Sequence, residues 1–316
     1  MKKLNFLLKL FVGVLILSFL LFKFGFKNIL SDIISINPIF IVLIFIILTI
    51  SLILNGLNLK ILIHPFNKRL TISKLFYYGS LSWAVGMFVP AKLGEFSIIP
   101  LLKKHDIEIG TGTSISVLDK LVTFITLSII SIIGFLLFLP LKETMILISA
   151  ILVLLSIFIF LFISGIGRRL IKNFILKKFA VNFKGFSKTM FYFFKKQKSL
   201  LLLNFIITFL KWFMTSFMVY IIFLAYKQNI SILSVFLINS MLMVISLIPI
   251  SISGLGIRES VSVVLFNYLN INPEITLSSY ILILIVTYIT ALIILLSGLN
   301  EIKSFMSLKN KTIILK

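Results

Sequence analysis

The segment from Phe88 to Glu95 combines backbone-breaking residues and opposite charges within apolar sequence. Pro90 and Gly94 both disfavour a continuous helix, and Lys92 and Glu95 lie within one helical turn of each other. In lipid, irregular backbone is tolerated only where it is buried in protein or lines a wet cavity, and ionisable groups there are candidates for function. The segment therefore predicts a polar site at membrane depth.

A second segment of the same kind runs from Pro249 to Glu259. Like the first, it contains a proline, then glycine, then a basic and an acidic residue close together, here Arg258 and Glu259. We expect both segments to interrupt their helices. The predicted breaks are at Pro90, Gly94, Pro249, Ser253, Gly254 and Gly256.

Three more charged residues lie inside apolar runs. Asp119 and Lys120 stand in the first turns of one run, and as neighbours they should point to different faces of a helix. Lys211 is near the middle of another run, where its side chain is too far from the membrane surface to reach it easily, so we expect it to face the protein interior and a carboxylate.

These charges are candidates for contact with a lipid headgroup. The basic groups would contact a phosphate, and the acidic groups would balance them or bind a cationic headgroup. The alternative is that the charges pair with one another and only hold helices together, and that the glycines only allow close helix packing. The candidate headgroup residues are Lys92, Glu95, Asp119, Lys120, Lys211, Arg258 and Glu259.

Composition places these residues in a multi-pass membrane protein. Of the 316 residues, 60% are hydrophobic and only 13% are charged, which no soluble domain matches. There is no cysteine and there are two histidines, so thiol chemistry and a histidine-rich metal centre are not expected. We predict neither a metal nor another cofactor.

The apolar runs predict an all-α integral membrane protein with about seven full spans, because about 20 residues of helix cross the hydrocarbon core. Two interrupted regions, 75–110 and 230–274, are too broken for ordinary spans, and we interpret them as re-entrant hairpins that enter from opposite faces. That arrangement is typical of an inverted repeat with a site near the midplane. The spans that can be delimited run over residues 4–22, 38–59, 115–139, 144–164, 200–225 and 275–298.

The whole chain, 1–316, is predicted to form one polytopic membrane domain. Its first half is 1–165, its second half is 200–316, and a basic amphipathic loop, 166–199, joins them. Residues 168–198 carry ten lysines and arginines and no acid, with phenylalanines interleaved. This pattern suits the anionic lipid of the cytoplasmic leaflet. Nucleic acid is not expected, because the basic residues lie between apolar segments. The charges predict a cell-membrane location with both termini cytoplasmic.

Three motifs together resemble the flippase-like transmembrane family of lysylphosphatidylglycerol synthase. They are Pro90-Ala91-Lys92-Leu93-Gly94-Glu95, Val117-Leu118-Asp119-Lys120-Leu121, and the segment from Pro249 to Glu259, in which Ser253-Gly254 stands where the family usually has paired glycines. The resemblance covers nearly the whole chain. It implies translocation of a polar lipid, possibly aminoacylated or otherwise modified. We expect the membrane domain only, without the aminoacyl-transferring domain.

The leading hypothesis is a lipid flippase or headgroup transporter that performs no catalysis and has membrane phospholipid or a lipid-linked substrate as its partner. A second hypothesis is a polytopic enzyme acting on a lipid-linked substrate, with Glu95 and Glu259 as an acid and base pair. A third is a membrane scaffold that transports nothing. A second copy of the chain, forming a homodimer, is a further candidate partner.

Overall fold

The computed structural model describes residues 2–66, 69–170, 185–246, 250–299 and 301. Within these ranges the regular elements are all helical, as the sequence predicts. In chain order they are α1 (Lys2–Phe24), α2 (Phe26–Ser35), α3 (Pro38–Ile63), α4 (Ile72–Met87), η1 (Pro90–Ser97), α5 (Ile98–Lys103), α6 (Ile109–Phe138), α7 (Leu141–Ile163), α8 (Gly165–Leu170), α9 (Phe186–Lys196), α10 (Lys198–Ala225), α11 (Ile232–Ile245), α12 (Ile257–Asn267) and α13 (Pro273–Ser297).

Six of the described helices are long and apolar enough to cross a membrane, where the sequence predicted about seven. They are α1, α3, α6, α7, α10 and α13, and they coincide closely with the delimited apolar runs. The second interrupted region supplies no further full span, because it is divided between α11, which has 14 residues, and α12, which has 11. At 1.5 Å per residue neither helix crosses the hydrocarbon core alone.

Two of the spanning helices begin at an asparagine and proline pair. The side chain of Asn37 accepts a hydrogen bond from the Ile39 amide (3.0 Å) at the start of α3, and that of Asn272 accepts one from the Glu274 amide (2.8 Å) at the start of α13. The asparagine satisfies an amide that has no partner within the helix, and the proline that follows it has no amide to satisfy.

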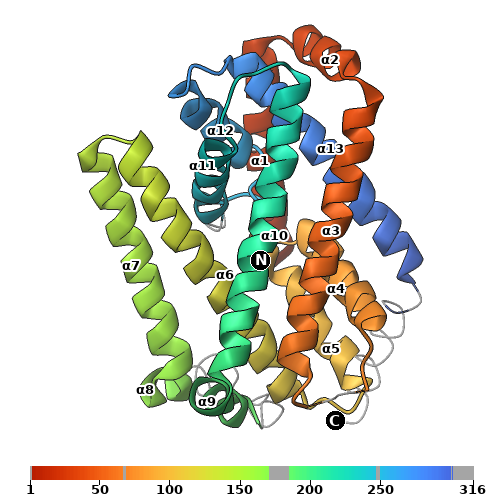
Figure 1. Cartoon of the computed structure of the whole chain (residues 1–316), viewed down its shortest axis with the longest axis vertical. Helices are drawn as coiled ribbons and strands as arrows, with labels where there is room; N and C mark the ends of the chain where they lie inside the picture. The colour runs from red at the N-terminus through yellow and green to blue at the C-terminus, as the bar shows by residue number, and fades with distance from the viewer. Residues whose placement is uncertain (1, 67–68, 171–184, 247–249, 300, 302–316) are drawn as a thin grey trace.

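The two interrupted regions form half-length hairpins at opposite ends of the molecule. In Figure 1, α4 and α5 occupy the lower half and α11 and α12 occupy the upper half. We call α4, η1 and α5 the lower hairpin and α11, α12 and the residues between them the upper hairpin. This is the opposed arrangement that the charge pattern predicted.

The backbone is irregular where the sequence predicts it. The lower hairpin turns at Pro90, which opens a 3-10 helix, and Lys92 has a φ of 52°. In the upper hairpin, Ser253, Gly254 and Gly256 have φ values of 49°, 79° and 78°, which no continuous α-helix contains. Pro249 lies outside the described residues.

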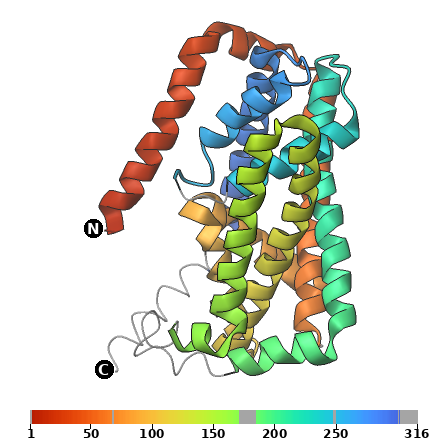
Figure 2. The same ribbon diagram turned by 90° about the vertical axis from the view of Figure 1, so that its left-hand side faces the viewer.

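Two helices lie across the ends of the bundle. At the lower end lies α9 (Figure 2). It buries Met190 and Phe193 and exposes Lys188 and Lys195, so it is amphipathic as predicted. The predicted basic loop also includes residues 171–184, which lie outside the described residues. At the upper end, α2 crosses from α1 to α3 (Figure 1). The sequence did not predict α2, since its ten residues separate two apolar runs.

Candidate functional site

The first group of charges joins the lower hairpin to α6. Lys120, on α6, forms an ion pair with Glu95 of η1, and its Nζ also lies 3.1 Å from Asp119 Oδ2. The side chains of Glu95 and Asp119 are mostly buried. We expected Asp119 and Lys120 to point to different faces of α6. Asp119 is buried and Lys120 is partly exposed, and the long lysine side chain still reaches the carboxylate of its neighbour.

The second group lies at the start of α12. Glu259 is completely buried, and its Oε2 accepts a hydrogen bond from the Gly256 amide (2.7 Å). Its Oε1 accepts two from Arg258, at 3.1 and 3.2 Å. The Arg258 guanidinium also lies over the Tyr280 ring of α13, 5.9 Å from its centroid. The carboxylate therefore satisfies the first turn of α12 and holds the arginine in place.

The third group is built on Trp212 of α10. The Nζ atoms of Lys92 and Lys211 each lie 5.8 Å from the centroid of its indole ring. Lys211 faces the interior, as predicted. The expected carboxylate partner was wrong, because its Nζ donates a hydrogen bond to the amide oxygen Asn55 Oδ1 at 3.4 Å. Neither lysine has a carboxylate within 4.0 Å among the described residues. The buried Trp212 Nε1 has no acceptor in the same part of the chain.

The tips of the two hairpins contact each other between these groups. Ser253 Oγ of the upper hairpin donates a hydrogen bond to the Gly86 carbonyl of the lower hairpin (3.1 Å). From α13, Tyr288 Oη donates to the Met87 carbonyl (3.3 Å), and its ring packs edge-on against Phe88. Contacts between segments more than 160 residues apart thus fix the two irregular backbones against each other.

The three groups are close enough to act as one. Lys92 lies within electrostatic range of Glu95, Arg258, Lys120 and Lys211. We call the seven predicted charged residues together with Trp212 the polar cluster. Its four basic and three acidic side chains give a formal net charge of +1. Within the described residues, the carboxylates contact Lys120 and Arg258, so the uncompensated positive charge is concentrated at Lys92 and Lys211.

Two glycines allow the hairpins to close. A Cβ atom at Gly94 would lie 2.6 Å from the Val85 backbone, and one at Gly256 would lie 2.6 Å from the Gly13 carbonyl of α1. Both distances are well inside van der Waals contact, so these glycines have a packing role as well as a conformational one. That role is the alternative that the sequence left open for them.

Three contacting residues were not among the predicted site residues. Trp212 follows Lys211 directly, near the middle of the same apolar run. That position was the one feature of the sequence that could have indicated a role for Trp212 in the site. Asn55 and Tyr280 are 156 and 22 residues from the basic groups that they contact, Lys211 and Arg258. Only the fold reveals such pairs.

The comparison with protein families agrees with the motifs. The family model described as the lysylphosphatidylglycerol synthase TM region matches residues 6–294. The comparison with curated proteins gives no match for this chain. The matched region contains all six candidate spans except the last residues of α13, together with both hairpins and every residue of the polar cluster. This multi-pass membrane protein therefore belongs to the family of the lysylphosphatidylglycerol synthase transmembrane region, a family related to lipid modification or transport.

Proposed function

We propose that the protein binds the phosphate-bearing headgroup of a membrane lipid at the polar cluster and moves that lipid between leaflets without changing it chemically. One observation carries the proposal. Lys92 and Lys211 flank Trp212 inside the membrane region, and neither contacts a carboxylate among the described residues. Unbalanced charge at this depth is costly, so an anion that reaches the cluster would be stabilised.

The donors around Trp212 suit an oxyanion. Two ammonium groups and an indole N–H can only donate hydrogen bonds, and phosphate oxygens only accept them. Hydrogen bonds to charged groups contribute about 1.5–3 kcal/mol each. The acidic residues Glu95, Asp119 and Glu259 lie in the same cluster, so a headgroup that also carries an amine could pair with them. We therefore favour a zwitterionic or modified phospholipid as substrate.

The fold supports movement as well as binding. The polar cluster lies where two half-length hairpins from opposite ends meet, and such a site is opened to either side by tilting one half against the other. Among the described residues, a hydrogen bond from Ser253 to Gly86 joins the two hairpins. A neutral hydrogen bond contributes only about 0.5–1.5 kcal/mol, so breaking it is compatible with exchange between two arrangements on the timescale of domain motions.

The test is transport in vesicles containing purified protein and fluorescent phospholipids of differing headgroup, with and without a proton gradient or membrane potential. We compare the native chain with Glu95→Gln, Arg258→Ala, Lys92→Met and Lys211→Met. The expected result is headgroup-selective movement that each substitution slows by about tenfold or more. Lys142→Met, an exposed lysine in the first turn of α7, is the matched control and should transport normally.

Two outcomes would contradict the proposal. If the folded protein moves no lipid under any of these conditions, a scaffold becomes the better hypothesis. If mass spectrometry of the recovered lipid shows a changed headgroup, the protein is an enzyme acting on a lipid. Equal rates for Lys211→Met and Lys142→Met would remove the mid-membrane lysine from the mechanism.

We also propose that α9 rests on the cytoplasmic leaflet and attracts anionic lipid. Its exposed lysines, Lys188, Lys195 and Lys196, surround a buried face that contains Phe193. Each lysine near an anionic surface contributes about 1 kcal/mol. Replacing all three with glutamine should weaken binding of anionic lipid by the purified protein, measured by lipid retained after detergent exchange, and unchanged retention would overturn this assignment.

A further inference from the structure

Helix α2 presents three distinct faces although it has only ten residues. Ile29 is buried against the bundle. Phe26, Leu30 and Ile34 follow one another at four-residue spacing and are exposed, Ile34 by 73%. Lys27, Ser31 and Ser35 form the next stripe and are also exposed. The apolar and polar stripes therefore adjoin along the outer side of the helix.

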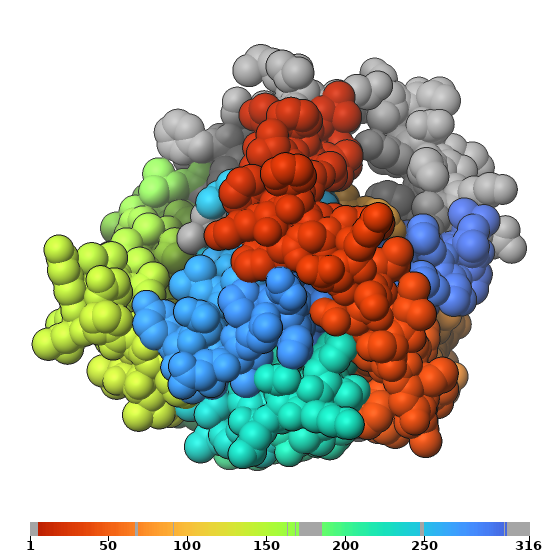
Figure 3. Space-filling view, turned by 90° about the horizontal axis from the view of Figure 1, so that it is seen from above, coloured from red at the N-terminus to blue at the C-terminus, as the bar shows by residue number. Residues whose placement is uncertain are grey.

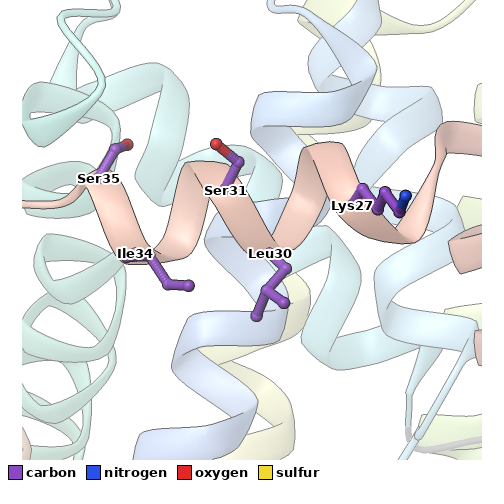
Figure 4. Close-up of a pocket in the computed structure, with 5 residues that line it drawn as sticks. All are labelled: Lys27, Leu30, Ser31, Ile34 and Ser35. Atoms are coloured by element: carbon purple, nitrogen blue, oxygen red, sulfur yellow. The ribbon is translucent and has the colours of Figure 1, made fainter.

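A surface pocket follows the boundary between these two stripes. Its lining residues are Lys27, Leu30, Ser31, Ile34 and Ser35. In Figure 4, Leu30 and Ile34 extend to one side of the helix, and Ser31 and Ser35 extend to the opposite side. Seen from above, the residues of α1 to α3 lie at the surface of this end of the molecule, with no other described segment over them (Figure 3).

The orientation of α2 is fixed by its neighbours. Ser278 Oγ of α13 donates a hydrogen bond to Asp32 Oδ2 (2.9 Å), on the side of α2 away from the pocket. Gly25 precedes α2 with a φ of 83°, and Pro38 begins α3 soon after its end, so the chain turns sharply on both sides. The helix consequently lies across the end of the bundle, beside the ends of the long apolar helices α1 and α3 (Figure 1).

We propose that this pocket holds a membrane phospholipid, with its phosphate at Lys27 and Ser31 and its acyl chains along Leu30 and Ile34. The apolar stripe supplies the surface that a lipid chain covers, and the adjoining ammonium and hydroxyl groups supply donors for the phosphate. This site is separate from the polar cluster and does not depend on transport.

The experiment uses the absence of cysteine from the chain. A fluorophore is attached to Ile34→Cys, and the protein is reconstituted into phosphatidylcholine vesicles with increasing amounts of nitroxide-labelled phosphatidylglycerol. We expect strong quenching at low lipid fraction. Lys27→Ala should raise the lipid fraction needed for half-quenching about fivefold, and Lys27→Arg should restore it. Lys142→Ala is the matched control, an exposed lysine in the turn at the same end, and should have no effect.

Two results would overturn the proposal. One is quenching of the labelled Ile34→Cys protein that is identical with and without Lys27→Ala, which would remove the phosphate contact. The other is reaction of Ile34→Cys with a water-soluble maleimide as fast as Ser31→Cys, which would place both stripes in water. Neither measurement uses lipid transport, so the result stands whether or not the protein moves lipid.

Discussion

At the scale of single residues, the buried charges differ in how completely they are paired. Arg258 and Glu259 satisfy each other and the start of α12, and Lys120 contacts the carboxylates of Glu95 and Asp119. A buried ion pair adds little net stability, because desolvation offsets its attraction, but removing one partner is strongly destabilising. The paired charges thus have a structural role that Lys92 and Lys211 do not share.

Glu259 provides the sharpest test of that structural role. In Glu259→Ala, both Arg258 and the Gly256 amide lose a buried partner, so we expect a loss of about 3–5 kcal/mol in stability. Glu259→Gln keeps an acceptor for the amide but loses the charge, and should lose less. Thermal unfolding in detergent, followed by tryptophan fluorescence, measures both.

The matched control is Glu143→Gln, an exposed glutamate in the first turn of α7, which should unfold at the native temperature. If Glu259→Ala also unfolded at the native temperature, the buried carboxylate would be dispensable for the upper hairpin. Its role in the polar cluster would then have to be functional alone.

We expect the stability of the protein to depend on pH through His105, which lies outside the spans in the turn between α5 and α6. Its Nε2 lies 3.1 Å from Tyr78 Oη. Burial, followed by the positive charge of Lys74, lowers the pKa of His105 below its usual value, and Asp106 and Glu301 only partly oppose this. Because the folded state favours the neutral imidazole, its contribution to stability is present above the unfolded pKa of about 6.5 and is lost as the pH falls below it.

The expected result is a melting temperature that falls between about pH 7 and pH 5. His105→Gln keeps a hydrogen-bonding group near Tyr78 but does not titrate, so its melting temperature should fall less over the same range. If the melting temperature fell equally with pH in the native protein and in His105→Gln, groups other than His105 would dominate the loss of stability in acid.

The sequence alone identified the charged residues of the site but not their partners. Seven charges in apolar sequence are conspicuous because each one is costly in lipid. Trp212, Asn55 and Tyr280 carry no such signal, since an aromatic or amide side chain in a membrane helix usually has a packing role. The ion pair between Asp119 and Lys120 was also missed, because helix periodicity places Cβ atoms and not the ends of long side chains.

At the scale of elements, the lower hairpin depends on one close approach. The backbone of Gly94 crosses that of Val85 so tightly that a Cβ atom would lie 2.6 Å away. Gly94→Ala should therefore separate α4 from η1 and move Lys92 and Glu95 out of the polar cluster. We expect about 1–3 kcal/mol of destabilisation together with loss of transport.

Gly112→Ala is the control for this substitution. The added Cβ would meet its nearest neighbour, Ile99, at 3.6 Å, which is ordinary contact, and alanine is the better helix former by about 1 kcal/mol. This variant should be as stable as the native protein or more so. If Gly94→Ala behaved in the same way, the hairpin would be more deformable than its packing indicates.

The elements that could be predicted from the sequence differ from α2, which could not, in the length and apolar character of their residues. Long spans show as apolar runs of about 20 residues, and the hairpins show because Pro90, Gly94, Gly254 and Gly256 interrupt such runs. Helix α2 leaves no comparable trace. Seven of its ten residues are exposed, and its direction across the bundle is set by the contact of Asp32 with Ser278 and not by an apolar run.

At the scale of the whole molecule, the arrangement of the hairpins fixes which turns share a side of the membrane. The turns after α6 and α10 lie at the upper end, and the turn after α5 lies with α9 at the lower end (Figures 1 and 2). Lysines gather around α9 and at the end of α5. Short loops rich in lysine and arginine face the cytoplasm, so the lower end is expected to be cytoplasmic.

Cysteine scanning of the cysteine-free chain tests this topology directly. Lys142→Cys and Lys227→Cys represent the upper end, and Lys103→Cys and Ser187→Cys represent the lower end; all four positions are exposed. A membrane-impermeant maleimide should label the first pair in intact cells and the second pair only after permeabilisation. The native chain, without cysteine, is the control for background. The reverse pattern would invert the molecule. Labelling of Lys142→Cys and Lys227→Cys from opposite sides would mean that α7 and α10 do not both cross the membrane. The upper hairpin would then enter from the same side as the lower one, which would remove the opposed hairpins on which a shared midplane site depends.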